Sequence, residues 1–325
     1  MKKISLLLAL IIVGVLVVWF VNSEKVANNT PKEESAIVIG YIGPLTGPSA
    51  VLGMDAIKAL EIKTSEINDE GGINGRKIQL ITEDDQYLVK NTVSAYQKLT
   101  QVNKAKIVLV ATYGGFLALQ DRAAMDGVIM INPLDCNKAI ADASRNSFCL
   151  ATETESIGYV LADQMIKNKQ MTAGIMYSTK DSFMNLVTTE FKARFEAAGG
   201  KTFVESFNYE DKDFKAQLSK LSTNKIDGLV LLGHDETGVI MKQARDLKIN
   251  VPFYTTGTIT SPGAQQASAG TSEGTVFAYW DASANNAASE AFVKKFTDSV
   301  GRPPILPLTT HPAHDTLSVI ADVLA

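Results

Sequence analysis

Few residues in this chain are suited to catalysis or to metal binding. Among 325 residues there are 3 histidines, 2 cysteines and 2 tryptophans. The chain contains no Gly-x-Ser-x-Gly, His-Glu-x-x-His or phosphate-binding Gly-Lys-Ser/Thr sequence. His311 and His314 have a His-x-x-His spacing, but Pro312 between them disfavours a shared helix face. The sequence therefore predicts no enzyme, no metal site and no cofactor.

The chain also lacks a run of basic residues. Its 31 Lys and Arg against 35 Asp and Glu give a net charge of −4, which argues against nucleic acid as a partner. Hydrophobic residues make up 46% and charged residues 20%, values that are ordinary for a globular protein. The length is sufficient for two domains.

One long apolar run, Ile4 to Val21, follows Lys2 and Lys3 and has the pattern of an export signal. It is longer than the usual signal core of about 7–15 residues and reaches the roughly 18 residues that span a bilayer. We expect residues 1–22 to be an uncleaved membrane anchor, with a cleaved signal peptide as the alternative. In both cases the rest of the chain lies outside the cytoplasmic membrane. The polar segment 23–36 is predicted to be a flexible linker.

The two cysteines are Cys136 and Cys149. An even number of cysteines in an exported protein favours a disulfide bond. Two buried thiols remain the alternative.

The first part of the chain after the linker has the pattern of a βαβ unit. The apolar residues Ile37 to Ile42 predict a buried strand, and a Gly- and Pro-rich loop, 43–48, follows it. A helix is expected over 50–68 and a second strand over 78–81. In open α/β sheets, ligands bind at the carboxyl ends of such strands.

The same alternation continues to the end of the chain and predicts mostly parallel sheets with helices on both faces. The spacing Thr-x-x-Glu from Thr152 to Glu155 predicts a capping box that opens a helix, and Asp181 is expected to cap the next. Further expected strands are 107–111, 128–131, 173–177, 202–207, 228–232, 253–256 and 275–280, and further expected helices include 92–102, 116–125, 239–247, 288–300 and 314–324.

The stretches IGPLTGPSAVLG and EINDEGGINGRKIQLITEDDQ resemble the start of the mature Leu/Ile/Val-binding protein family. These are extracytoplasmic type I substrate-binding proteins of ABC transporters. The resemblance runs from Ile37 to the end of the chain and implies a two-lobed α/β fold. Lobe 1 would comprise 37–152 and 278–325, and lobe 2 would comprise 153–277. Family members usually continue beyond the helix that begins near His314, so we expect either that the sequence is incomplete or that this edge of the lobe is unusual.

In lobe 1 the resemblance implies two ligand loops. Tyr113, Gly114 and Gly115 would bind a ligand carboxylate, although the family often has Ser or Thr here. Leu134 and Asp135 match the second loop, in which the carboxylate of Asp135 would meet a ligand amino group. A turn residue that satisfies local N–H groups is an equal alternative for Asp135.

In lobe 2 the resemblance implies three further positions. Phe183, with Ser182 beside it, would cover the ligand, and a core role for Phe183 is the alternative. His234 stands where the family has an aromatic wall, and a structural histidine is the alternative. Gly257 stands where amino-acid-binding members carry an acidic residue. Either the acidic role passes to Asp135, or the ligand is not an ordinary amino acid, in which case aromatic or other carboxylates, small amides and sugars are the alternatives.

The resemblance implies a binding protein that closes on an amino acid or a related carboxylate and presents it to an ABC permease and ATPase. A membrane-anchored sensor of the same fold is the main alternative. A sugar-responsive repressor is disfavoured by the export segment and by the lack of a DNA-binding head. The segment Glu83-Asp84-Asp85 is expected to be the solvated end of a strand.

Overall fold

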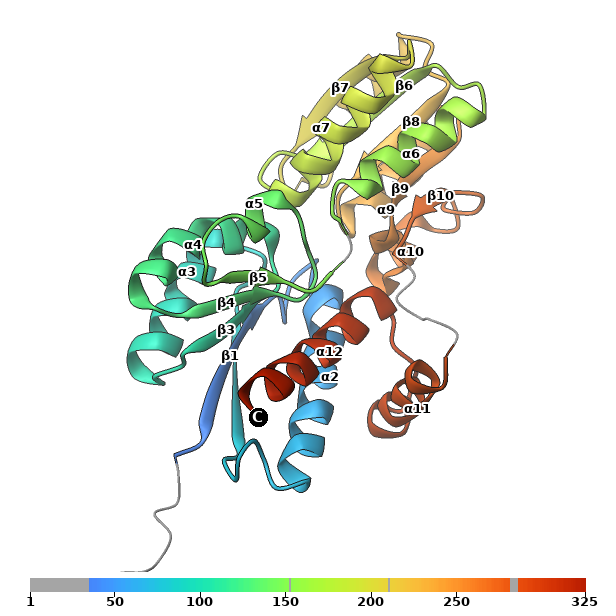
Figure 1. The fold of residues 1–325 in the computed structure, drawn as a ribbon. Helices are drawn as coiled ribbons and strands as arrows, with labels where there is room; N and C mark the ends of the chain where they lie inside the picture. Colours follow the sequence, from blue (N-terminus) through green and yellow to red (C-terminus); the bar gives the residue numbers. More distant parts are fainter. Residues whose placement is uncertain (1–34, 152, 210, 281–285) are drawn as a thin grey trace, which may run out of the picture. The chain divides into compact units, whose positions relative to one another are not determined.

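The computed structural model describes residues 35–151, 153–209, 211–280 and 286–325 (Figure 1). The predicted anchor, 1–22, lies outside these residues, as does the predicted linker except for its last two positions. Within the described ranges, no helix combines the length and the apolar character needed to cross a membrane.

The first sheet contains five parallel strands in the order β2-β1-β3-β4-β5. All four residues of β3, Ile-Val-Leu-Val, are buried, as are the last five of β1, which is expected for the centre of a parallel sheet covered by helices. Pairing of Ile37 with Ile78 and of Ile39 with Ile107 sets the register around β1. The strands are β1 (Ile37–Gly43), β2 (Ile78–Asp84), β3 (Ile107–Val110), β4 (Ile129–Asn132) and β5 (Ser147–Cys149).

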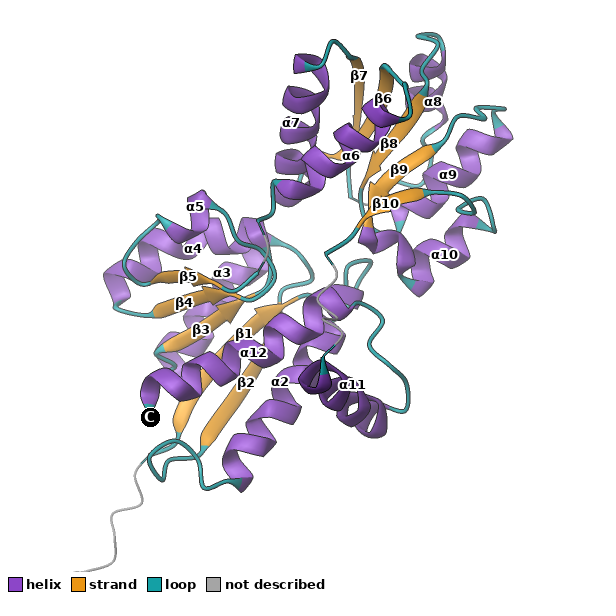
Figure 2. Cartoon of the chain, turned by 45° about the vertical axis from the view of Figure 1, so that its right-hand side comes forward, coloured by secondary structure: helices purple, strands orange, loops and turns teal. Residues whose placement is uncertain are grey.

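Helices cover both faces of this sheet (Figure 2). On one face Leu60 and Leu317 pack with Leu109 of β3, and on the other Tyr96 and Phe116 pack with Val108. The first face is covered by α2 (Val51–Asp69), α11 (Ala287–Val300) and α12 (Pro307–Leu324), and the second by α3 (Val89–Gln97), its π-helical continuation (Lys98–Val102), α4 (Tyr113–Asp126) and the short α5 (Lys138–Ala141).

The second sheet repeats this plan with five parallel strands in the order β10-β9-β8-β6-β7. Its strands are β6 (Thr172–Ser178), β7 (Lys201–Phe207), β8 (Gly228–Leu232), β9 (Phe253–Thr256) and β10 (Val276–Ala278). One face is covered by α6 (Ser156–Lys167) and α7 (Ser182–Ala197), and the other by α8 (Lys215–Ser222), α9 (Glu236–Asp246) and α10 (Pro262–Ser268). A 3₁₀ turn, Gly257–Thr260, follows β9. The two parallel, helix-covered sheets confirm the predicted fold class.

Several local predictions were wrong. Helix α6 begins at Ser156 with Glu155 as its N-cap, three positions later than the predicted cap; the predicted cap residue, Thr152, lies outside the described residues. Helix α12 begins at Pro307 and contains Pro312, because its apolar face packs against α2 and outweighs the lost backbone hydrogen bond. The sequence also missed α5, β5 and α10.

Candidate functional site

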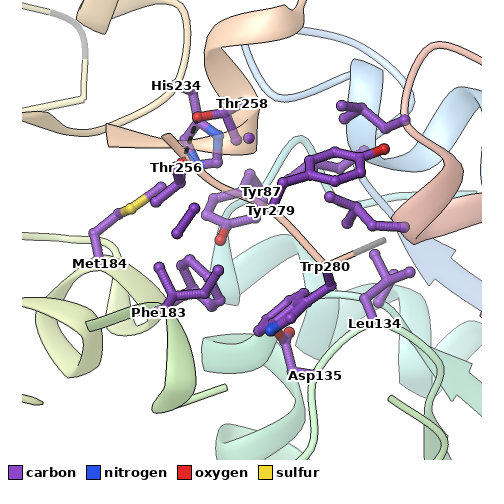
Figure 3. A pocket seen from close by; sticks show the side chains of 17 residues that line it. Tyr87, Leu134, Asp135, Phe183, Met184, His234, Thr256, Thr258, Tyr279 and Trp280 are labelled. Atoms are coloured by element: carbon purple, nitrogen blue, oxygen red, sulfur yellow. Dashed lines mark hydrogen bonds between the residues drawn. The ribbon is translucent and has the colours of Figure 1, made fainter. Parts of the chain in front are cut away.

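A cavity lies at the carboxyl ends of strands from both sheets (Figure 3). It contains about 580 Å³ of space, a figure that includes open solvent at its mouth. Most of its wall is aromatic or aliphatic, and a few polar side chains interrupt it. The lining residues are Leu52, Tyr87, Ala111, Leu134, Asp135, Ile157, Phe183, Met184, His234, Thr256, Gly257, Thr258, Ala278, Tyr279, Trp280, Leu306 and Leu308.

Asp135 contributes a buried carboxylate to this wall from the loop after β4. The loop is held by Asn132, whose side-chain oxygen accepts the backbone N–H groups of Leu134 and Asp135, both at 2.8 Å. Asn132 donates only one long bond, 3.4 Å, to Oδ2 of Asp135. Burial raises the pKa of Asp135 to about 7; the bond from Asn132 opposes this shift, and the charge of Asp181 adds to it. A buried carboxylate with a single donor among the described residues is suited to accept hydrogen bonds from a ligand.

A disulfide bond between Cys136 and Cys149 links this loop to β5, with the two Cα atoms 5.2 Å apart. It confirms the predicted bridge and excludes the alternative of two buried thiols. The bond closes the loop directly after Asp135 and restrains the backbone that carries this carboxylate.

Asp181 and His234 form a buried pair on the second sheet's side of the cavity. Asp181 caps α7, as predicted, because its Oδ1 accepts the N–H of Met184 at 3.1 Å. Its Oδ2 lies 2.9 Å from Nε2 of His234, and the two side chains are 1% and 3% exposed. Burial alone would lower the pKa of His234, but the hydrogen bond and charge of Asp181 raise it above its ordinary value, helped by Glu236 and Asp235.

Tyr87 is a cavity residue that the sequence analysis missed. Gln86 and Tyr87, in the loop after β2, have φ values of 53° and 62°. Non-glycine residues in this left-handed region concentrate at functional sites. The hydroxyl of Tyr87 donates to Oδ1 of Asp181 at 3.3 Å, and its ring lies edge-on to His234 with centroids 4.8 Å apart. The ring also stacks on Tyr209 at 6.3 Å.

The acidic strand end before Tyr87 was wrongly predicted to be solvated. Asp85 is fully buried and accepts hydrogen bonds from the hydroxyls of Thr92 and Thr112 and from the backbone N–H of Tyr87. Asp84 accepts hydrogen bonds from the backbone N–H of Leu45 and the hydroxyl of Thr46. These carboxylates therefore fix the loop that carries Tyr87. The adjacent sequence Asp-Asp-Gln-Tyr at a strand end was the available signal.

Aromatic residues close the other side of the cavity. Phe183 and Trp280 meet edge to face with their ring centroids 6.3 Å apart, and Nε1 of Trp280 donates to Oγ of Ser156 at 3.0 Å. Tyr279 lies against Gly257, where an added Cβ would come within 2.5 Å of the Tyr279 ring. This close approach explains why glycine occupies the position expected to be acidic. The aromatic cluster Phe277-Ala278-Tyr279-Trp280 was a visible sequence signal that went unused.

The predicted site residues fall into two groups. Five of them line the cavity: Leu134, Asp135, Phe183, His234 and Gly257. The other four, Tyr113, Gly114, Gly115 and Ser182, are not part of its wall.

The second group lies in first turns of helices. Tyr113 begins α4 and is not in a loop, and its hydroxyl accepts a hydrogen bond from Nδ2 of Asn137 at 2.7 Å. A Cβ at Gly114 would lie 2.9 Å from Oγ of Ser182, so these two residues are in close contact. Ligand contact by these residues remains a prediction from the resemblance.

The described residues contain no group of three or more His, Cys, Asp or Glu side chains that could hold a metal ion. His311 and His314 share α12, yet His311 approaches Oγ of Ser289 at 2.9 Å, and His314 lies 3.6 Å from Oε2 of Glu66. Both histidines therefore serve contacts between helices.

Known proteins have sequences that are similar to most of the length of this chain. A Leu/Ile/Val-binding protein homolog 2 of Brucella abortus is 27% identical over 266 residues, which cover 81% of this chain and 72% of that protein. Leu/Ile/Val-binding protein BraC3 of Rhizobium johnstonii is 29% identical over 226 residues, 68% of this chain and 61% of that protein.

Solved structures show the same fold. A leucine-binding protein of Thermotoga maritima superposes with a TM-score of 0.79 at 19% identity, covering 88% of this chain and 82% of that one. A solute-binding protein of an ABC transporter from Rhodopseudomonas palustris, in complex with benzoate, superposes with a TM-score of 0.74 at 22% identity, covering 88% and 79%. These relatives confirm the resemblance seen in the sequence. The profile of the family described as periplasmic binding protein matches residues 36–324, and the chain therefore belongs to the periplasmic binding protein family.

Proposed function

We propose that this chain captures a small, largely apolar solute that carries an amino group, and delivers it to an ABC permease and its ATPase. The observation that carries this proposal is the placement of a buried, underpaired carboxylate, Asp135, in a mostly apolar cavity. An amino group on the solute would supply the donors that Asp135 lacks. The relatives named for leucine, isoleucine and valine support an amino acid or a related compound as the solute.

The cavity takes side chains from both sheets, which suits binding by hinge closure. Lobe 1, 37–152 and 278–325, contributes Tyr87, Leu134 and Asp135, and lobe 2, 153–277, contributes Phe183 and His234. A solute that contacts both lobes only when they are closed stabilises the closed form by that difference in contact. The permease can then distinguish loaded from empty protein by shape.

Membership of the periplasmic binding protein family supports a location outside the cytoplasm. We propose that the apolar segment 4–21 anchors the chain to the outer face of the cytoplasmic membrane. The alternative is that this segment is a signal peptide that is cleaved off. Extraction without detergent distinguishes the two, because an anchored chain stays in the membrane fraction and a cleaved chain does not.

The ligand class is tested by thermal denaturation of the full-length chain with leucine, isoleucine, valine, benzoate and a sugar, each checked by calorimetry. A ligand at 100 times its Kd adds about 2.7 kcal/mol to the free energy of unfolding. We expect stabilisation by at least one branched amino acid. Stabilisation by benzoate or the sugar alone would contradict the proposed ligand class.

A further inference from the structure

One ring nitrogen of His234 has no hydrogen-bond partner within the described part of the chain. The residue is 2% exposed and lines the cavity (Figure 3). Nε2 is engaged by Asp181 at 2.9 Å, whereas Nδ1 is buried with no hydrogen-bond partner among the described residues. A buried polar atom without a partner costs roughly 1–3 kcal/mol. Because His234 lines the cavity, a ligand group is the candidate partner for this atom.

The hydrogen bond to Asp181 determines which roles remain for Nδ1. An ionised carboxylate only accepts, so Nε2 must carry a proton. Nδ1 is then an acceptor in the neutral ring and a donor in the imidazolium form.

The surroundings of the ring favour the imidazolium form. Three carboxylates act on the ring: Asp181 at the start of α7, and Asp235 and Glu236 at the start of α9. Two tyrosine rings also approach it, Tyr87 from the loop after β2 and Tyr209 from the loop after β7. No lysine or arginine is among these groups, and the net effect is a raised pKa for His234. In the imidazolium form, Nδ1 bears a proton that needs an acceptor.

The cavity offers few other sites for a negatively charged ligand group. No lysine or arginine belongs to its wall as the structure describes it. The predicted carboxylate loop, at Tyr113 to Gly115, is also absent from the wall. The imidazolium of His234 is thus the only side-chain cation among the described lining residues, and Asp135 is the acidic one.

From this arrangement we infer that Nδ1 of His234 donates a hydrogen bond to the acceptor group of the ligand, a carboxylate or an amide carbonyl, while Asp135 receives its amino end. Asp181 is a positioning residue that holds the ring through Nε2. The inference rests on the proposed function and assigns the two polar ends of the solute to named residues. His234 then has a hydrogen-bonding role in addition to forming part of the wall.

The protonation of His234 can be measured without any ligand by ¹⁵N NMR of histidine-labelled full-length chain at pH 7. The chain has 3 histidines, and His234→Gln identifies the signals of His234 by their loss. We expect both ring nitrogens of His234 to be protonated, and Asp181→Asn to abolish this state. An unprotonated Nδ1 in the parent would overturn the inference.

The ligand contact is tested with three probes that share one apolar body: leucine, 4-methylpentanoate, which lacks the amino group, and 3-methylbutylamine, which lacks the carboxylate. His234→Gln keeps a side-chain donor for Asp181 and removes the Nδ1 donor. We expect it to weaken binding of the carboxylate probe roughly tenfold or more, the effect of losing a charge-assisted hydrogen bond. The dissociation constant of the amine probe should change by less than about twofold. His314→Gln, outside the cavity, is the matched control.

The pH dependence provides a second readout. Carboxylate binding should weaken as pH rises and His234 loses its proton, whereas amine binding should strengthen as pH rises through about 7 and Asp135 ionises. If His234→Gln lowered the affinities for 4-methylpentanoate and 3-methylbutylamine equally, His234 would have only a structural role and the inference would be overturned. Failure of all three probes with the parent would contradict the proposed ligand class, while the NMR result would still decide the state of Nδ1.

Discussion

The hydroxyl of Tyr87 donates to Oδ1 of Asp181 at 3.3 Å, although 94 positions separate the two residues in sequence. A second bridge of this kind joins Oγ of Ser49 to the hydroxyl of Tyr209 at 2.5 Å, across 160 positions. Each bridge connects a residue near the first sheet with one near the second. The two tyrosine rings also stack on each other, so the four residues form one clasp at the cavity.

Removing the hydroxyls of the clasp should favour the open form. The double variant Tyr87→Phe/Tyr209→Phe lacks both hydroxyls. Each lost hydrogen bond should reduce the free-energy difference that favours the closed form by about 1 kcal/mol, which lowers the ratio of closed to open protein roughly fivefold. Small-angle scattering of the ligand-free protein should show a larger radius of gyration for the double variant. Tyr159→Phe removes a comparable hydroxyl bond to Glu190 within one face of the second sheet, and should change nothing. An unchanged radius in the double variant would rule out the clasp as a contribution to closure.

Asp135 should cost the protein stability at high pH. Its pKa rises from 3.8 in the unfolded chain to about 7 in the folded one, so the folded state holds the proton more tightly between these values. The free energy of unfolding therefore falls as pH rises through this window, by on the order of 4 kcal/mol.

Asp135→Asn removes this dependence. We expect the variant to be more stable than the parent at pH 8 and similar near pH 4, in urea denaturation at both values, while its affinity for amino-bearing ligands falls. Asp142→Asn, at an exposed carboxylate, is the control. Parallel pH profiles for parent and Asp135→Asn would contradict the raised pKa.

The disulfide bond should contribute measurably to stability. It closes a loop across a separation of 13 residues, for which the loss of unfolded-state entropy amounts to about 3 kcal/mol. The double variant Cys136→Ser/Cys149→Ser should melt at a lower temperature, and reductant should lower the melting temperature of the parent but not that of the variant. A parent that is insensitive to reductant, with both thiols free in peptide mapping, would contradict the bond.

Asp55 and Arg302 should hold the C-terminal segment to α2. Arg302 donates two hydrogen bonds to the Asp55 carboxylate, at 2.6 and 2.9 Å, and the backbone N–H of Ile305 adds a third at 2.8 Å. The Asp55 side chain is 2% exposed and that of Arg302 is 39% exposed. Removing one partner of a fully buried pair costs roughly 3–5 kcal/mol, and partial exposure reduces this.

We expect Arg302→Ala to lower the free energy of unfolding by about 2 kcal/mol, because it leaves a buried carboxylate with one remaining donor. Asp55→Asn/Arg302→Ala should recover part of this loss, since the uncompensated charge is gone. Chemical denaturation of the four members of this double-mutant cycle measures the coupling. Strictly additive effects would show that the pair contributes nothing.

Local patterns in the sequence predicted the fold well where burial and propensity agree. The predicted strands at Gly228–Leu232 and Phe253–Thr256 have the observed bounds, because each is a short run of residues that favour β structure between turn residues. Asp181 was correctly identified as a helix cap. The prediction failed at Pro312. Proline disfavours a helix interior, but the packing of α12 on α2 overrides this preference, and that packing cannot be seen in the residues next to Pro312.

The sequence by itself determined the α/β class and the family, favoured the disulfide bond, and identified five residues of the cavity wall. These depend on local patterns, on the number of cysteines or on the resemblance. Only the tertiary structure placed Tyr87, Tyr279 and Trp280 in that wall and removed Tyr113 to Gly115 from it. It also showed that Nδ1 of His234 has no partner among the residues that the structure describes. The reason is physical: burial and hydrogen bonding at a ligand cavity depend on side chains that are distant in sequence and meet only when both sheets are folded.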